Sequence, residues 1–386
     1  MNQKHISFRT LRMSLLLLLG VAIVTFSSRI MASPMPQLIA QTNTGPQIQT
    51  TDPMQVQPEG SNPAWAPDID PQMLAVVEQL MAFKAPPYTE LTAAQAREVP
   101  SATDAVMAIL RKTGTPPMPA TVDIAHQVIP GPTPEGVLVR TYTPLEGKGP
   151  FPVIVYYHGG GWVIANLNTY EPSARALAEK TGAVVVSVAY RQAPEYKFPA
   201  AHEDSFAAYC WAVENAGSIN GDPNRVAVAG ESAGGNLAVA VALMARDRDV
   251  KLPVHVLSVY PIADGNTQSP SYQQYADAIP LNRPLVQWFF DKYLGNPADA
   301  NSPLISLVNA DLHGLPSTTI INAEIDPLRS EGKKLAQRMR KAGVPVEQQT
   351  FQGVTHEFFG MASILKQAVQ AQDLAVRRLQ EAFGIK

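Results

Sequence analysis

From residue 120 onward, short apolar and β-branched runs alternate with stretches whose apolar residues recur every three or four positions. The first pattern is typical of buried strands and the second of helices. The runs expected to be strands are 137–142, 154–157, 184–188, 226–229, 254–260, 319–322 and 346–351. Strands separated by helices usually pair in parallel, since each helix carries the chain back across the sheet. The pattern therefore predicts an α/β fold with a mostly parallel sheet covered by helices on both faces.

The amino-terminal part of the chain has the pattern of an export signal. Lys4, Arg9 and Arg12 precede an apolar run over residues 13–28, and this order is typical of a signal peptide. We expect residues 1–32 to be such a leader and the protein to be exported, either periplasmic or secreted. The alternative is an uncleaved membrane anchor, because Ile30 and Leu38 stand where a cleavage site favours small residues. Membrane contact is expected only in that case.

The leader is followed by a region without apolar periodicity. Residues 33–68 are rich in Pro, Gln, Thr and Asn, which predicts a flexible linker. Two helices are expected next, over 70–83 and near 103–112, in an amino-terminal helical region spanning 69–118. The main α/β domain would then occupy residues 119–386. Within it, residues 263–294 interrupt the alternation and form a candidate cap insertion.

Composition and charge add two exclusions. The chain has 386 residues with 46% hydrophobic content and a net charge of −3. It is long enough to bury one large core, and its charge balance predicts no nucleic-acid partner. It holds a single cysteine and no HExxH motif, so we expect no metal site and no zinc hydrolase.

Two glycine-flanked motifs follow predicted strands. One is HGGGW at residues 158–162 and the other is GESAG at residues 230–234. A Gly-x-Ser-x-Gly sequence between a strand and a helix predicts a sharp turn that exposes its central residue, Ser232. The helix that starts after Ser232 points free N–H groups at the same place. The glycines after His158 allow a second backbone segment to approach closely and supply further N–H donors. Together the motifs predict an acyl-transfer site.

A serine nucleophile needs a base and an acid that orients the base, and the expected chain order is Ser, Asp, His. Asp326 follows the strand predicted at 319–322, and His356 follows the strand predicted at 346–351. We therefore expect Asp326 to be the acid and His356 the base. Glu324 is a nearby competitor, and an aspartate before proline is also typical of a helix N-cap.

The other histidines lack the required order. His158 precedes the glycine turn and is expected to brace that loop with its ring. The remaining ones are expected to be structural or surface residues, or to lie in the leader: His5, His126, His202, His255 and His313.

These motifs together resemble the bacterial hormone-sensitive-lipase-like (family IV) serine esterases of the α/β-hydrolase superfamily. The resemblance covers roughly residues 70–386 and rests on motifs in a fixed order. They are HGGGW at 158–162, YRQAPE at 190–195, FPAA at 198–201, GESAGG at 230–235, DPL at 326–328 and the late His356.

The resemblance implies the α/β-hydrolase fold with a helical cap and a serine carboxylic-ester hydrolase without a cofactor. It implies a triad of Ser232, Asp326 and His356 and an oxyanion hole made by the N–H groups of three other residues. Those three are Gly160, Gly161 and Ala233, with supporting positions at His158, Gly159 and Glu231.

In the family, the amino-terminal helices help to cap the site. This would place Met73, Leu80 or Phe83 at the mouth of the pocket, although ordinary packing on the sheet is an equal alternative for each.

The chain departs from the family pattern at three positions. Gln192 stands where leucine is usual, Ser330 where an acidic residue is usual, and Glu357 where glycine is usual. A carboxylate beside His356 would raise its basicity or crowd the pocket.

We expect a two-step reaction through an acyl-enzyme on a small-molecule ester, with short acyl chains preferred. The alternatives left by the sequence are an amidase or peptidase on the same fold, and a ligand-binding receptor without catalysis.

Overall fold

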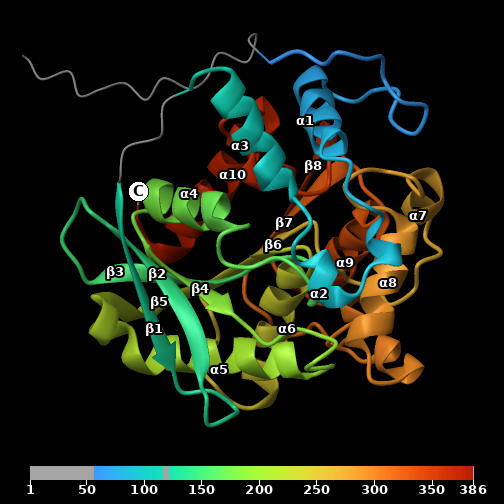
Figure 1. The fold of residues 1–386 in the computed structure, drawn as a ribbon. Helices are drawn as coiled ribbons and strands as arrows, with labels where there is room; N and C mark the ends of the chain where they lie inside the picture. The colour runs from blue at the N-terminus through green and yellow to red at the C-terminus, as the bar shows by residue number, and fades with distance from the viewer. Residues whose placement is uncertain (1–55, 116–120, 386) are drawn as a thin grey trace, which may run out of the picture. The chain divides into compact units, whose positions relative to one another are not determined.

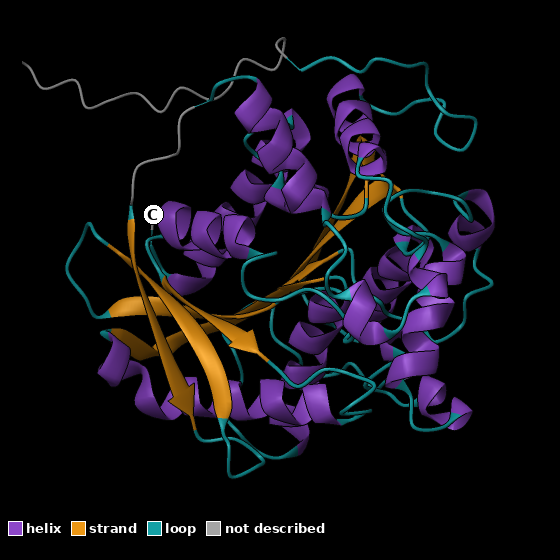
Figure 2. Ribbon diagram, in the orientation of Figure 1, coloured by secondary structure: helices purple, strands orange, loops and turns teal. Residues whose placement is uncertain are grey.

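Within the residues that the computed structural model describes, 56–115 and 121–385, eight strands form one sheet (Figures 1 and 2). Their order across the sheet is β1-β2-β4-β3-β5-β6-β7-β8. The strands are β1 (Val122–Ile129), β2 (Val137–Pro144), β3 (Phe151–Tyr157), β4 (Val184–Ala189), β5 (Gly221–Glu231), β6 (Val256–Val259), β7 (Thr318–Ile325) and β8 (Val346–Thr355).

The sheet is parallel from β4 to β8, and only β1 and β2 run antiparallel to their neighbours. The predicted α/β fold with a mostly parallel sheet is therefore confirmed. Strand β1 is missing from the strands expected in order along the sheet, although the run around His126 is strand-like in sequence. It lies at the edge of the sheet, and most of its side chains are exposed.

The central strands separate two hydrophobic cores. Successive residues of β3 alternate between them: Val153 and Val155 belong to one core, and Ile154 and Tyr156 to the other. A strand that is buried on both faces must be apolar at every position, and all seven residues of β3 are buried.

Helices cover both faces of the sheet (Figure 1). Helices α5 (Ala200–Asn215), α6 (Ala233–Asp247) and α9 (Arg329–Lys341) pack in the first core. Helices α1 (Pro71–Ala82), α3 (Ala102–Lys112), α4 (Glu171–Thr181) and α10 (Lys366–Phe383) pack in the second. The remaining helices are α2 (Ala93–Ala96), α7 (Pro270–Gln274) and α8 (Arg283–Tyr293).

The predicted amino-terminal helices are present as α1 and α3. Asp70 caps α1 by accepting hydrogen bonds from the N–H groups of Gln72 and Met73, and Pro71 fits the first helical position because it has no N–H to satisfy. Ser101 and Asp104 form a capping box at the start of α3. Both helix starts therefore follow from local sequence.

The expected linker requires a correction at its carboxyl end. Val56 and Ala66 are buried in the second core, and Glu78 accepts hydrogen bonds from the N–H groups of Glu59 and Gly60. The predicted flexible stretch therefore does not extend through residues 56–68. The predicted leader, residues 1–32, and linker residues 33–55 lie outside the described residues. No helix in the described part of the chain is long and apolar enough to cross a membrane.

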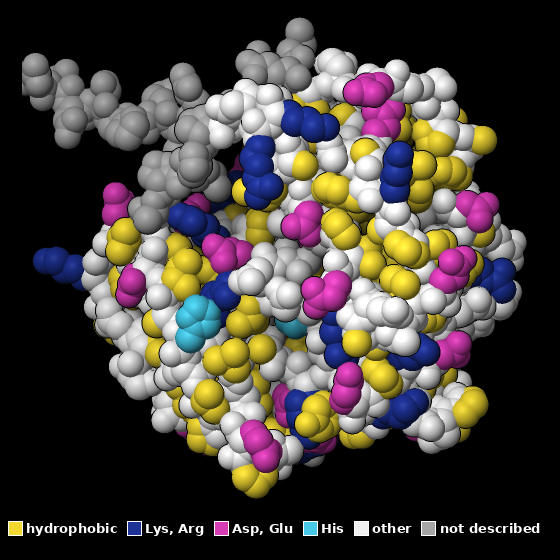
Figure 3. All heavy atoms as spheres, viewed as in Figure 1, with side chains coloured by type: hydrophobic (Ala, Val, Ile, Leu, Met, Phe, Trp, Pro, Cys, Tyr) yellow, Lys and Arg dark blue, Asp and Glu magenta, His cyan; other side chains and the backbone are white. Residues whose placement is uncertain are grey.

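Basic and acidic side chains are interspersed over the face shown in Figure 3. This distribution accompanies the small net charge of −3.

Candidate active site

Ser232 lies on a sharp turn between β5 and α6. Its backbone has φ 58° and ψ −119°, which is unusual for a residue with a side chain. The strain is held by hydrogen bonds on both sides: the Ser232 N–H donates to Val259 O (2.9 Å), and its carbonyl accepts from Asn236 N (3.0 Å). The side chain is 5% exposed and lines a cavity.

Gly230 and Gly234 make this turn possible. A Cβ on Gly230 would overlap the backbone of Gly234, and a Cβ on Gly234 would overlap the backbone at Tyr157 and His158. The strand and the helix therefore approach each other more closely than any side chain would permit, which is the crowding expected from the sequence.

Two residues of the second glycine motif, Gly160 and Gly161, line the same cavity as Ser232. Gly160 has φ 96° and Gly161 has φ 59°, and a Cβ on Gly161 would overlap the ring of Phe289. Within the described residues, the N–H groups of both glycines have no acceptor. Ala233 is the first residue of α6, so its N–H has no partner inside the helix. Gly160 and Gly161 line the cavity, and Ala233 follows Ser232, which also lines it.

His158 braces the glycine loop, as expected. Its ring stacks on Tyr190 with centroids 4.3 Å apart, and its Nδ1 lies 2.8 Å from Gly159 O. The Tyr190 hydroxyl donates to His158 O (2.8 Å). Burial lowers the pKa of His158 to about 4, so the ring is neutral at physiological pH and serves packing.

Asp326 and His356 meet at the carboxyl ends of β7 and β8. The Nδ1–H of His356 donates to Asp326 Oδ2 (2.7 Å), and the other carboxylate oxygen accepts from Leu328 N (2.8 Å). Asp326 therefore both orients the imidazole and stabilises the turn before α9. The Nε2 of His356 is buried without a hydrogen-bond partner among the described residues, and His356 lines the same cavity as Ser232.

The charge state of His356 reflects opposing effects. Burial acts to lower the pKa of His356, but the charge and hydrogen bond of Asp326, followed by the charges of Glu357 and Glu231, raise it above its ordinary value. The protonated imidazolium form of His356 is therefore stabilised, and this is the form that a base takes after accepting a proton.

Glu324, the competing acid, points elsewhere: its Oε2 accepts from Gly353 N (2.8 Å). His202 and His255 are buried among hydroxyl, amide and carbonyl groups, whereas His313 is exposed beside Asp311. His126 lies in β1, and His5 lies outside the described residues.

Glu231 lies beneath the site in a buried network that the sequence did not reveal. The hydroxyl of Tyr156 donates to Glu231 Oε1 (2.5 Å), and that of Tyr260 donates to Oε2. The centroids of the Tyr260 ring and the His356 imidazole are 4.4 Å apart. Burial raises the pKa of Glu231 to about 7. The network therefore contacts the base through the Tyr260 ring, and its charge can change near neutral pH.

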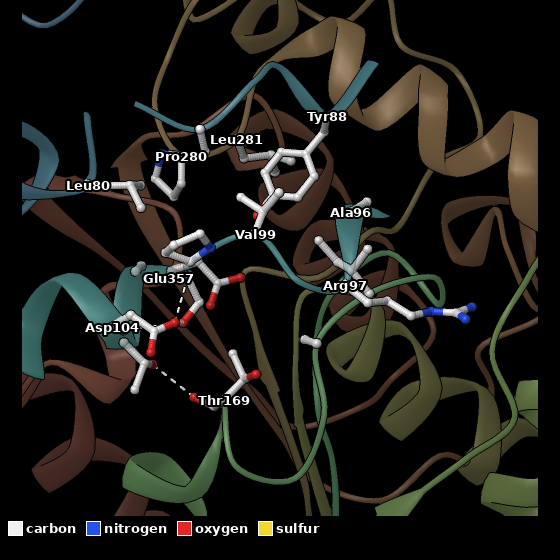
Figure 4. A pocket seen from close by; sticks show the side chains of 18 of the residues that line it. Leu80, Tyr88, Ala96, Arg97, Val99, Asp104, Thr169, Pro280, Leu281 and Glu357 are labelled. Atoms are coloured by element: carbon white, nitrogen blue, oxygen red, sulfur yellow. Dashed lines mark hydrogen bonds between the residues drawn. The ribbon is translucent and has the colours of Figure 1, made fainter. Parts of the chain in front are cut away.

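The cavity that Ser232 lines has a volume of about 850 Å³, and much of its wall comes from segments outside the sheet (Figure 4). Leu80 and Phe83 line it, whereas Met73 is buried in the second core. Of the three residues expected at the mouth, two therefore lie at the cavity and one packs internally. The candidate cap insertion also contributes wall residues: Ile279, Pro280, Leu281, Leu285 and Phe289.

Arg97 ties the amino-terminal wall to the glycine loop. Its guanidinium donates to Val163 O (2.9 Å) and Ala193 O (2.8 Å) and pairs with Glu195 (2.6 Å). Gln192 holds the same loop by donating to Ile164 O and Ala165 O. Arg97 was not identified from the sequence, because its partners lie 66 to 98 positions away.

The other two departures from the family pattern also have defined surroundings. Ser330 and Ser271 exchange hydrogen bonds between backbone N–H and hydroxyl groups. Glu357 adopts a left-handed conformation, with φ 73°, which explains why glycine suits this position. The Tyr170 hydroxyl donates to Glu357 Oε1 (2.6 Å), which lies 3.9 Å from His356 Nε2.

A model of the alpha/beta hydrolase fold family matches residues 154–360. The carboxylesterase NlhH of Mycobacterium tuberculosis is 36% identical over 322 residues, covering 82% of this chain and 97% of that protein. The ethyl acetate hydrolase of Pseudomonas putida is 34% identical, covering 63% of this chain and 78% of that protein. The solved structure of a hyperthermophilic esterase from Pyrobaculum calidifontis is also similar, with a TM-score of 0.74 and 35% identity over 81% of this chain and 98% of its own.

Proposed function

The chain belongs to the hormone-sensitive-lipase-like branch of the α/β-hydrolase fold family and is a serine ester hydrolase, and we propose that Ser232, Asp326 and His356 carry out this hydrolysis on small, short-acyl esters. One observation carries the assignment. His356 has Nδ1 fixed by Asp326, while its buried Nε2 has no hydrogen-bond partner within the described residues and its ring lines the cavity that Ser232 also lines.

The proposed reaction begins when Ser232 Oγ attacks the ester carbonyl carbon and its proton passes to His356 Nε2. The carbonyl oxygen becomes an oxyanion, which accepts hydrogen bonds from the N–H groups of Gly160, Gly161 and Ala233. One such donor contributes about 3–4 kcal/mol to the transition state. Asp326 keeps the imidazole oriented and stabilises its positive charge.

The tetrahedral intermediate collapses by breaking the bond to the alcohol oxygen, which takes the proton from His356 Nε2. The acyl group is then bonded to Ser232. Water enters, gives a proton to Nε2 and attacks the acyl carbon. A second collapse releases the acid and returns the proton to Ser232.

The cavity supports a preference for small substrates. Its volume of about 850 Å³ lies within the range of pockets that enclose small organic ligands. Within the described residues, its walls are formed by short helices and the loops between them, which is consistent with esters that are soluble as single molecules.

A panel of p-nitrophenyl esters from acetate to palmitate, with matching p-nitroanilides, tests the proposal. We expect the highest kcat/KM for acetate or butyrate and no comparable turnover of the anilides. Faster hydrolysis of emulsified long-chain triglyceride than of a butyrate ester would contradict the acyl preference, and faster turnover of the anilides would indicate an amidase. The Ser232→Ala variant provides the background rate.

We also propose that the protein is exported, on the basis of the basic and apolar residues at positions 4–28. Sequencing of the amino terminus of the protein recovered outside the cytoplasm tests this. An intact Met1 on membrane-bound protein would favour the anchor instead.

A further inference from the structure

The cavity wall next to the base carries a carboxylate that the hydrolytic steps do not use. Glu357 lines the cavity, and its Oε1 lies 3.9 Å from His356 Nε2. The side chain is 24% exposed and is held in place by the hydrogen bond from Tyr170. Within the described residues, Glu357 has no ion pair with a lysine or arginine. The carboxylate is therefore fixed at the reacting centre and available to a ligand.

This carboxylate occupies a position where any side chain is unfavourable. A residue with a Cβ in the left-handed region costs about 1–2 kcal/mol relative to a right-handed one. Glutamate at φ 73° therefore bears a conformational penalty that glycine would avoid.

An aromatic side chain and a second carboxylate face the same space. Figure 4 shows Tyr88, Asp104 and Glu357 around one cavity, with Arg97 directed away from Glu357. Burial, followed by the negative charges of Glu357 and Asp104, raises the pKa of Tyr88 to about 12, so both carboxylates act on the Tyr88 hydroxyl.

Two arginines line the cavity, against three carboxylates that line it with them. The guanidinium of Arg97 is engaged by Glu195 and two carbonyl oxygens. Arg111 is exposed in the last turn of α3. An aromatic ring beside carboxylates is the combination that recognises ammonium groups, through cation–π attraction and charge pairing.

The position of Glu357 indicates which half of a substrate it would contact. His356 Nε2 must lie near the leaving alcohol oxygen in order to protonate it. A carboxylate beside Nε2 on the cavity wall therefore lies beside the alcohol portion of the ester rather than deep along the acyl chain.

We propose that Glu357, with Tyr88 and Asp104, forms a subsite for a cationic group on the alcohol portion, so that esters of amino alcohols are preferred substrates. This inference rests on the proposed ester hydrolysis at Ser232. It assigns Glu357 the role of a specificity-determining residue, with Tyr170 as the residue that positions it.

A matched pair of esters tests the subsite: butyrylcholine and 3,3-dimethylbutyl butyrate, in which a carbon atom replaces the charged nitrogen. The kcat/KM ratio of the two esters is measured for the wild type, Glu357→Gln and Glu214→Gln. The third protein has the same change in charge on an exposed residue of α5. Because both esters use the same base in each protein, the ratio removes any effect of the substitution on His356.

We expect the wild type and Glu214→Gln to favour the cationic ester about tenfold at low salt, with a smaller preference at high salt. In Glu357→Gln the ratio should fall close to one. Equal rates on the two esters in the wild type, or the same ratio in the wild type and Glu357→Gln, would overturn the subsite while leaving ester hydrolysis intact. Absence of Ser232-dependent turnover of both esters would overturn the proposed function itself.

Discussion

Replacing Glu231 with glutamine is expected to stabilise the folded protein at neutral and alkaline pH. Glu231 is buried, with 1% of its surface exposed, and burial raises the pKa of its carboxyl from 4.5 to about 7. The hydroxyls of Tyr156 and Tyr260 act in the opposite direction but do not offset the lost hydration.

The raised pKa means that the folded state binds a proton more tightly at Glu231 than the unfolded state does. The resulting stabilisation is present in full below pH 4.5 and is lost as the pH rises through about 7. The interval between these two values corresponds to about 3 kcal/mol in the free energy of unfolding.

Glutamine does not titrate, and like the protonated acid it offers both a donor and an acceptor to the two tyrosines. The free energies of unfolding of Glu231→Gln and the wild type should therefore be similar below pH 4.5. Above about pH 7 the variant should be the more stable by about 3 kcal/mol.

Urea unfolding followed by tryptophan fluorescence over this pH range measures the difference. Glu146→Gln, which removes an exposed carboxylate, is the control and should run parallel to the wild type. Parallel curves for Glu231→Gln and the wild type would refute the reasoning. A growing advantage of the wild type with pH would mean that the tyrosine hydrogen bonds outweigh burial.

Three further predictions concern the reacting groups. Ser232→Ala should retain the fold by circular dichroism and lose ester hydrolysis by about 10⁴-fold or more; a folded variant with most of its activity would show that the nucleophile is another residue. Glu357→Gly removes a charge that raises the pKa of His356, so the acid limb of the kcat/KM profile should move to lower pH, and superimposable limbs would mean that Glu357 does not tune the base. Gly161→Ala should lower kcat by about 10²–10³-fold, because its Cβ meets Phe289 and displaces an oxyanion donor; an unchanged kcat in the folded variant would remove Gly161 from the oxyanion hole.

The elements that could be predicted from the sequence are those whose signals are local. The central strands are buried on both faces, so their apolar runs identify them without reference to the rest of the chain. The turn at Ser232 was predictable for a similar reason, since Gly230 and Gly234 are required by steric crowding within a few residues.

The features missed by the sequence depend on contacts between distant segments. Tyr170 reaches Glu357 across 187 positions, and Tyr156 reaches Glu231 across 75. Arg97 likewise donates to backbone carbonyl groups, which every residue has and which therefore leave no signal in the sequence. Nothing local in the sequence shows that Leu80 lines the cavity while Met73, on the same helix, is buried in the core.

The walls and the floor of the cavity come from separate parts of the chain. The floor residues Ser232 and His356, like the buried Asp326, follow strands of the sheet, whereas part of the wall comes from residues 80–111 and 279–289. Substitutions in these wall segments can change the size and polarity of the cavity without moving the strand ends that hold the floor. Mutations in these wall segments can therefore change which substrates are accepted, one step at a time, while the groups that carry out hydrolysis stay in place. A variant library confined to the wall segments would be an efficient starting point for directed evolution.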